Sequence, residues 1–123
     1  MIAIGTDILK LDRIDEVMGR LGERFMQRIL TEVEQLEFQA SAQPNRLLGK
    51  RFAAKEAIAK ALGTGIGRGV SWQDMQIEHD EHGAPLVRLS GGALEVATAR
   101  GGSRVDLSLA DETDYVVAFA VLS

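Results

Sequence analysis

The chain contains no cysteine, only two prolines, and few aromatic residues, 5% of its 123 positions. The absence of cysteine excludes disulfide bonds, thiolate metal sites and a cysteine nucleophile, and it fits a reducing compartment. No stretch is apolar for the length of a membrane span, and the first residues lack a basic lead followed by an apolar run. We therefore expect a cytoplasmic protein without a membrane segment.

The charge is small in total but unevenly distributed. The net charge of −4 argues against non-specific binding of nucleic acid. Residues 1–62 carry 10 Lys and Arg against 9 Asp and Glu, a net of +1, whereas residues 63–123 carry 4 against 9, a net of −5. An anionic ligand or partner should therefore bind to the first half of the chain.

Apolar periodicity and turn signals predict one α+β domain over residues 1–123, with an antiparallel sheet packed against helices. Caps are expected at Asp12, at Asn45 or the residues just before it, at Ser90 and at Thr31, which has capping-box spacing to Glu34. The elements in order are a strand (2–7), four helices (12–21, 23–30, 31–40 and 46–62), two strands (75–80 and 85–90), a helix (91–100) and two strands (104–110 and 115–122).

The last predicted strand is apolar at every position from 116 to 121, without alternation. Such a strand must be covered on both faces. Two explanations remain open: another subunit covers one face, or the chain's own helices cover both.

The helix over 46–62 contains the stretch FAAKEAIAKAL, in which charges occur on more than one side. Arg51 and Lys55 lie in or beside the apolar arc, so their charged ends must reach solvent or meet an anion. Glu56 and Lys60 are one turn apart, which fits either a solvated ion pair or a site for phosphate and metal. The arc that we expect to face the core consists of Leu48, Ala54, Ile58 and Leu62.

Two further features are compatible with a phosphate-rich ligand. Asp7 follows a strand and could share a Mg²⁺ ion with Glu56, or it could be a turn or capping residue. Glycines alternate at 63, 65, 67 and 69 directly after the long helix. Gly63 is first a helix C-cap, and the alternation beyond it would let a ligand approach bare backbone.

Four arginines fall roughly on one stripe if residues 12–30 are helical. Such a stripe would meet an acidic partner surface, or it would be a solvated face balanced by neighbouring acids. The four are Arg13, Arg20, Arg24 and Arg28.

Taken together, IGTDI (4–8), RFAAKEAIAKALGTGIGRG (51–69) and LSLADE (107–112) resemble the holo-(acyl carrier protein) synthases, the small single-domain class of 4′-phosphopantetheinyl transferases. The resemblance covers essentially the whole chain. It implies the fold of that family and transfer of phosphopantetheine from coenzyme A to a serine of apo acyl carrier protein, in fatty acid biosynthesis. It further implies release of adenosine 3′,5′-bisphosphate, a requirement for Mg²⁺, and a homotrimer with active sites between subunits.

The resemblance also implies roles for individual residues. Asp7 and Glu56 would bind the metal and, with Lys60, serve catalysis; the general base would be Glu56 or a metal-bound water, with Asp111 a weaker candidate. Arg13 would meet the acidic helix of the carrier, helped by the other three arginines. The residues expected to contact coenzyme A are Arg51, Lys55, Lys60, Gly63, Gly65 and Ser108.

The sequence departs from the common family pattern in the penultimate strand, where Asp106 and Asp111 replace two histidines. A subgroup of the family shares the LADE ending, so the departure concerns the role of these positions and not membership. Two alternatives to the synthase remain. One is a non-catalytic module that binds a nucleotide or a carrier protein, against which Asp7, Glu56 and Lys60 argue. The other is a different Mg²⁺-dependent transferase that uses a nucleotide diphosphate.

Overall fold

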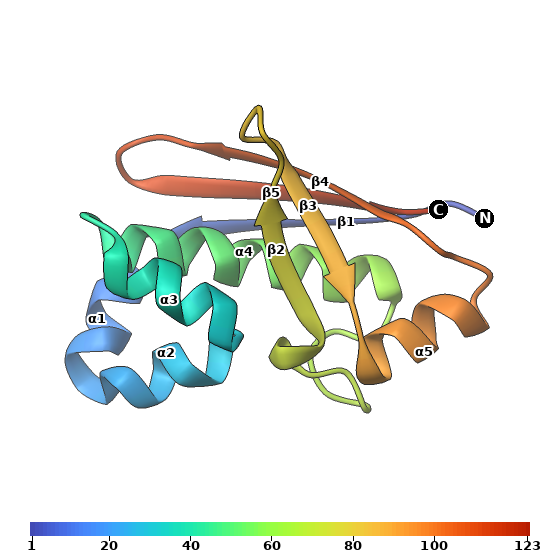
Figure 1. Cartoon of the computed structure of the whole chain (residues 1–123), viewed down its shortest axis with the longest axis horizontal. Coiled ribbons are helices and arrows are strands. Elements are labelled where there is room, and N and C mark those ends of the chain that lie inside the picture. Colours follow the sequence, from blue (N-terminus) through green and yellow to red (C-terminus); the bar gives the residue numbers. More distant parts are fainter.

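The computed structural model describes residues 1–123 and has the predicted order of elements (Figure 1). Five strands, five α-helices and one short 3₁₀ helix follow one another along the chain. They are β1 (Ala3–Lys10), α1 (Asp12–Leu21), α2 (Glu23–Ile29), α3 (Glu32–Ala40), α4 (Pro44–Leu62), η1 (Trp72–Asp74), β2 (Met75–His79), β3 (Pro85–Leu89), α5 (Gly91–Ala99), β4 (Val105–Asp111) and β5 (Tyr115–Leu122).

The strands form two antiparallel sheets. One has the order β1-β5-β4, in which Phe119 pairs with Thr6 on one side and Ser108 on the other, and the second is the β2–β3 hairpin. Helix α4 runs along one face of the larger sheet and packs against β1 and β5. Figure 1 shows α1, α2 and α3 grouped near the start of α4, with α5 near its end. The α+β prediction is therefore confirmed.

Helix α4 can lie close to β1 because small residues face each other. A Cβ atom placed on Gly5 would stand 2.1 Å from the carbonyl oxygen of Ala57, so only glycine fits there. Pro44 opens the helix at a position where its missing N–H costs nothing, and Gly63 ends it in the left-handed region with φ of 84°. The strand and the helix are thus held at backbone contact.

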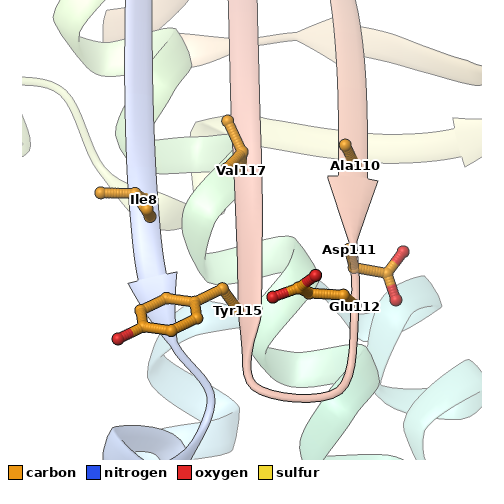
Figure 2. A pocket seen from close by; sticks show the side chains of 6 residues that line it. All are labelled: Ile8, Ala110, Asp111, Glu112, Tyr115 and Val117. Carbon is orange, nitrogen blue, oxygen red and sulfur yellow. The ribbon is translucent and has the colours of Figure 1, made fainter.

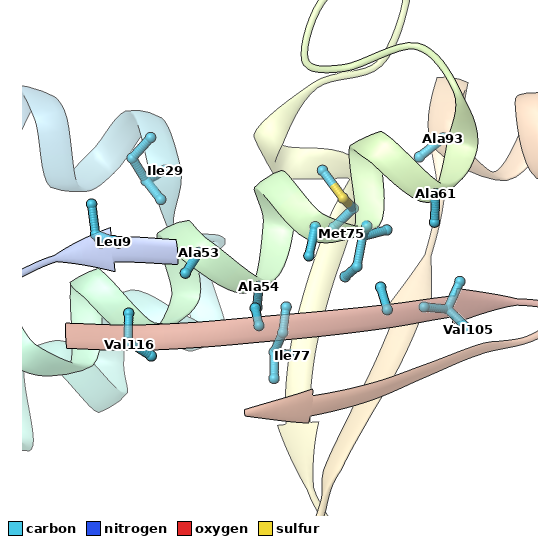
Figure 3. Close-up of a cluster of buried hydrophobic side chains, with 14 of the residues drawn as sticks. Leu9, Ile29, Ala53, Ala54, Ala61, Met75, Ile77, Ala93, Val105 and Val116 are labelled. Carbon is cyan, nitrogen blue, oxygen red and sulfur yellow. The ribbon is translucent and has the colours of Figure 1, made fainter. Parts of the chain in front are cut away.

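The core lies between α4 and the sheet, closed by residues of the hairpin. The four residues predicted to form the core arc of α4 are all buried. Figure 3 shows Ala54 of α4, Val116 of β5, and Met75 and Ile77 of the hairpin in one cluster.

The outer face of the larger sheet is not covered. Ile4 and Ile8 of β1 are 60% and 65% exposed, and Phe119 of β5 is 41% exposed, although Val116, Ala118 and the other inward residues of β5 are buried. The explanation that the chain's own helices cover both faces is therefore wrong. None of the helices is both long and apolar enough to span a bilayer.

Three of the predicted caps differ in the structure. Asp12 is the first residue of α1, which has Leu11 at the N-cap and no side-chain cap. Asn45 lies inside α4 and donates a hydrogen bond to Asp15, whereas Gln43, one of the residues before it, takes the N-cap position without a side-chain capping bond. Ser90 takes the N-cap position of α5 but makes no capping bond. The capping box of Thr31 and Glu34 is confirmed, with both of its hydrogen bonds present.

Candidate functional site

Asp7 of β1 and Glu56 and Lys60 of α4 line a single cavity of about 350 Å³. Arg13 of α1 completes its polar rim. The remaining wall is apolar and is made by Ile8, Leu9, Ile14, Val17, Phe25 and Phe52.

Local structure brings Asp7 to the helix. Asp7 shares the inner face of β1 with Gly5 and Leu9, so its side chain points toward α4 at the place where the strand touches the helix. Glu56 and Lys60 project from the same side of α4, because four residues make about one turn. The two acidic residues, 49 positions apart in the sequence, meet because Gly5 permits the contact.

Lys60 is bound to β1 and not to its helical neighbour. Its Nζ donates to the carbonyl oxygen of Thr6 at 2.9 Å and to Oδ1 of Asp7 at 3.2 Å. The side chain of Lys60 is 51% exposed, whereas that of Asp7 is only 16% exposed. The positive charge therefore sits at the mouth of the cavity, above the more buried carboxylate.

The two carboxylates influence each other. Burial raises the pKa of Glu56, the negative charge of Asp7 raises this pKa further, and Lys60 acts in the opposite direction. A cation placed between the carboxylates would relieve this repulsion. The structure holds no group of three or more His, Cys, Asp or Glu residues that could bind a metal on their own. Two carboxylates suit Mg²⁺, which takes few protein oxygens and completes its coordination with water and phosphate.

An aromatic stack supports the apolar wall. The ring of Phe52 lies 6.0 Å from that of Phe25 and 5.0 Å from that of Trp72, with the second pair stacked. Sequence analysis did not place Phe52 in the site, although its position one turn before Glu56 could have indicated it. Phe25, on α2, gave no such signal.

Lys55, predicted to contact coenzyme A, is fully buried and lies outside the cavity. Its Nζ donates to Oε1 of Glu34 at 2.6 Å and to the carbonyl oxygens of Ile29 and Trp72. Burial lowers the pKa of Lys55, and the Glu34 carboxylate opposes that shift. Its charged end thus meets an internal anion and does not reach a surface. Sequence analysis missed Glu34 as its partner, although the capping box had marked that residue.

Arg51 lies in a second, polar cleft of about 430 Å³. Its Nη2 donates to Glu37 at 2.8 Å, while its Nε is 3.8 Å from Glu34 and has no hydrogen bond. The cleft is also lined by Arg46, Lys50 and His79. Burial and the nearby charge of Arg51 lower the pKa of His79.

Asp111 lines this second cleft and not the cavity of Asp7 and Glu56. It accepts hydrogen bonds from Nε and Nη2 of Arg46 and lies 3.7 Å from Nζ of Lys50. The hydrogen bond from Arg46 is the main reason that the pKa of Asp111 is lowered. Asp106, the other aspartate that replaces a histidine, pairs with Arg104.

Asp111 also borders a shallow hollow of about 370 Å³ on the open sheet face. Figure 2 shows Ile8, Val117 and Tyr115 on this face, with Glu112 beside Asp111 at the end of β4. Ser108 is exposed on the same face, opposite Phe119. The predicted coenzyme-binding serine thus lies apart from the cavity within one chain.

The two glycines predicted to contact the ligand do not line the cavity. Gly63 is the C-cap of α4, and the N–H of Gly65 donates to Ala59 at the same helix end. Arg100 of α5 donates to the carbonyl oxygen of Ala61 and steadies this turn. The loop therefore begins one turn beyond Lys60.

The four arginines do not form one helical stripe. Gly22, with φ of 60°, separates α1 from α2, so Arg13 and Arg20 lie on one helix and Arg24 and Arg28 on the next. All four side chains are exposed, and none has an ion-pair partner within the chain. Only Arg13 reaches the cavity.

Two converging carboxylates flanked by a lysine and an arginine are the residue types that bind a divalent ion together with phosphate, as in phosphoryl-transfer enzymes. Comparison with known proteins agrees with this class. The chain belongs to the 4′-phosphopantetheinyl transferase superfamily, whose family model matches residues 3–120.

Similar proteins match along almost the whole chain. The holo-[acyl-carrier-protein] synthase of Shewanella amazonensis is 55% identical over 122 residues, which cover 99% of this chain and 98% of that protein. The crystal structure of the Neisseria meningitidis synthase has a TM-score of 0.94 and 46% identity, covering 100% of this chain and 99% of that one. The Bacillus anthracis synthase, solved in complex with CoA (3′,5′-ADP), has a TM-score of 0.81 and 35% identity over 98% of this chain and 94% of that one.

Proposed function

We propose that this chain is a holo-(acyl carrier protein) synthase. It transfers the 4′-phosphopantetheine group of coenzyme A to a serine of apo acyl carrier protein and releases adenosine 3′,5′-bisphosphate. The observation that supports this most is the meeting of Asp7, Glu56 and Lys60 in one cavity. The names of its similar proteins support the same reaction.

Asp7 and Glu56 would hold the Mg²⁺ ion. When bound there with the donor, the ion supplies positive charge to the diphosphate of coenzyme A. Lys60, at the mouth of the same cavity, offsets charge on phosphate oxygens as the adenosine bisphosphate leaves. No enzyme nucleophile is needed, because the hydroxyl of the carrier's serine attacks the phosphorus directly.

Glu56 is the residue best placed to accept the proton of that serine. It lines the cavity without a hydrogen bond or ion pair of its own, and its pKa is raised by burial and by Asp7. A carboxylate with a raised pKa is a stronger base at neutral pH than an ordinary one. Asp111 is a weaker candidate, since Arg46 and Lys50 hold its carboxylate in another cleft.

The remaining contacts to coenzyme A stay predictions. Arg51, Gly63, Gly65 and Ser108 lie outside the cavity within one chain, and Lys55 is enclosed by the fold. We therefore assign Lys55 to the support of α4 and keep the others as candidates whose contacts would depend on subunit assembly. A cytoplasmic location also stays a prediction.

Three copies of the chain would associate through the open sheet face. Support comes from the exposed apolar side chains on this face, among them Ile4, Ile8 and Phe119. A second observation is that Ser108 and Asp111 border this face, so a neighbouring copy could bring them to an active site. Light scattering should give three times the mass of the chain, and a monomer would contradict the proposal.

The reaction itself is tested by mass spectrometry of an apo carrier protein incubated with coenzyme A, Mg²⁺ and the protein. We expect a mass increase of one phosphopantetheine group. Glu56→Gln should slow this transfer at least about 100-fold, the usual scale for one electrostatic group in an active site. No mass increase with the wild-type protein, while coenzyme A still binds, would favour the non-catalytic module instead.

The carrier should dock on the arginines of α1 and α2. Because Arg13 is exposed and lacks an acidic partner, Arg13→Glu should raise the KM for the carrier and leave the KM for coenzyme A nearly unchanged. Steady-state kinetics at two salt concentrations would measure this, since docking through charge weakens as salt increases. Arg88→Glu on β3 is a control for the change in net charge, although it also breaks the pair of Arg88 with Glu78. Equal effects on both KM values would remove Arg13 from the docking surface.

A further inference from the structure

Lys60 and Asp7 form the only ion pair within the candidate cavity, and the inference below rests on the proposed function of that site. Nζ of Lys60 lies 3.2 Å from Oδ1 of Asp7 and 2.9 Å from the carbonyl oxygen of Thr6. The ammonium therefore occupies the space beside an oxygen that is expected to bind the metal.

Lys60 pairs with Asp7 and not with Glu56, the partner that helical spacing would favour. Glu56 is one turn before Lys60 on α4, the spacing at which Glu and Lys commonly pair. The ammonium nevertheless bonds across to β1, and Glu56 has no ion pair or hydrogen bond. One lysine thus faces two carboxylates, and the charge of Glu56 is not neutralised by any contact.

A divalent cation that binds Asp7 must compete with this ammonium. Two cations on one carboxylate repel each other, and they do so more strongly in a partly enclosed site than in water. Lys60 can yield because its side chain is 51% exposed and has a long, flexible stem. A phosphate oxygen at the mouth of the cavity would be an alternative partner for its charge.

We propose that Lys60 is the resident counter-ion of Asp7, which competes with the divalent cation until a diphosphate arrives and takes over the ammonium. The metal alone then binds weakly, and metal and diphosphate bind cooperatively. The coupling is reciprocal, so the metal strengthens diphosphate binding by the same factor. No covalent bond is made or broken in this exchange.

The test is a titration of the full-length protein with Mn²⁺, followed by electron paramagnetic resonance, with and without coenzyme A. For Lys60→Met we expect Mn²⁺ alone to bind about fivefold to tenfold more tightly than for the wild type, within the usual range of coupling between sites. The gain in Mn²⁺ affinity on adding coenzyme A should be about fivefold to tenfold larger for the wild type than for Lys60→Met, in which only the direct contact between metal and phosphate remains.

Two matched variants separate the position of the charge from its mere presence. Lys60→Arg keeps a cation at the same place and should behave like the wild type. Lys50→Met removes one positive charge from the same helix but in the second cleft, so it should leave Mn²⁺ affinity unchanged. In an Asp7→Asn background, Lys60→Met should lose its effect, because the shared carboxylate is gone.

The outcomes distinguish this inference from the proposed function. If Lys60→Met does not tighten Mn²⁺ binding while coenzyme A still strengthens it in both proteins, the competition is disproved and the proposed function stands. If the effect persists in the Asp7→Asn background, the competition is also disproved. If Mn²⁺ binds to no form, with or without coenzyme A, both the inference and the metal-dependent function are wrong.

Discussion

Lys55 and Lys60 are five residues apart on α4, and their environments are opposite. Lys55 is completely buried, and its ammonium has three acceptors from α2, α3 and η1. Lys60 is half exposed and has two acceptors, both on β1. The first lysine fastens the helix inside the protein, whereas the second remains available to a ligand.

The two lysines also differ in how many hydrogen bonds their carboxylate partners accept. Glu34 accepts from Lys55 and from the backbone N–H groups of Thr31 and Ile77, so the buried carboxylate has no open position facing a cavity. Asp7 accepts only from Lys60, and Glu56 accepts from nothing. A saturated buried pair suits structure, and an unsaturated pair at a cavity suits binding.

The largest effect on stability should come from breaking the buried ion pair of Lys55 and Glu34. Lys55→Met removes the hydrogen-bonded cation of the buried Glu34 carboxylate and leaves only the Nε of Arg51, 3.8 Å away. This should lower the free energy of unfolding by about 3 kcal/mol, the lower end of the range for a broken buried pair. Urea denaturation monitored by circular dichroism would measure this. Lys60→Met is the matched control, and its cost should be about 0–1 kcal/mol because the pair is partly exposed.

A second substitution sharpens the same result. Adding Glu34→Gln to Lys55→Met removes the unpaired charge but keeps an acceptor for only one of the two backbone donors, so the double variant should recover part of the loss. If the double variant is no more stable than Lys55→Met, the cost is one of packing and not of charge.

An intermediate effect is expected where β1 touches α4. In Gly5→Ala the new methyl group would overlap the carbonyl oxygen of Ala57, and relief of the overlap must move β1 away from the helix. We expect a loss of about 1–3 kcal/mol in unfolding free energy, the usual cost of overpacking. Transfer activity should fall as well, because Asp7 moves with the strand. Gly19→Ala on exposed α1 should leave activity unchanged and raise stability by about 0.5–1 kcal/mol, as Ala in place of Gly does within a helix.

The smallest effect concerns pH and Glu56. Because the pKa of Glu56 is raised in the fold, the folded protein holds this proton more tightly than the unfolded chain. Stability from this group is complete below the ordinary Glu pKa and is lost as pH rises through the raised value. Glu56→Gln should therefore be slightly more stable than the wild type at neutral pH, and the difference should vanish on acidification. If Glu56→Gln were less stable than the wild type at neutral pH, the raised pKa assigned to Glu56 would be contradicted.

Much of the fold could be predicted because its signals are local. Element order follows from apolar periodicity, the Thr31–Glu34 capping box lies within one turn, and Gly63 ends α4 as its position indicates. The first residue of α4 was missed by two positions, since Pro44 could open the helix without a side-chain cap.

The rest depended on contacts that are distant in sequence. Glu34 is 21 residues from Lys55, and Arg46 is 65 residues from Asp111, so neither partner could be identified from spacing. The arginine stripe required a continuous helix, which Gly22 interrupts. From the residues alone, the meeting of Asp7 with Glu56 was one of two alternatives, and the family resemblance favoured it. In the structure it depends on the backbone contact at Gly5.

The central claim is that Asp7 and Glu56 share one divalent ion with the diphosphate of coenzyme A. A crystal structure with coenzyme A and Mg²⁺ tests it most directly. We predict one ion at about 2.0–2.1 Å from an oxygen of each carboxylate and from phosphate oxygens. An ion bound to neither residue, or to the donor alone while both carboxylates point elsewhere, would contradict the claim.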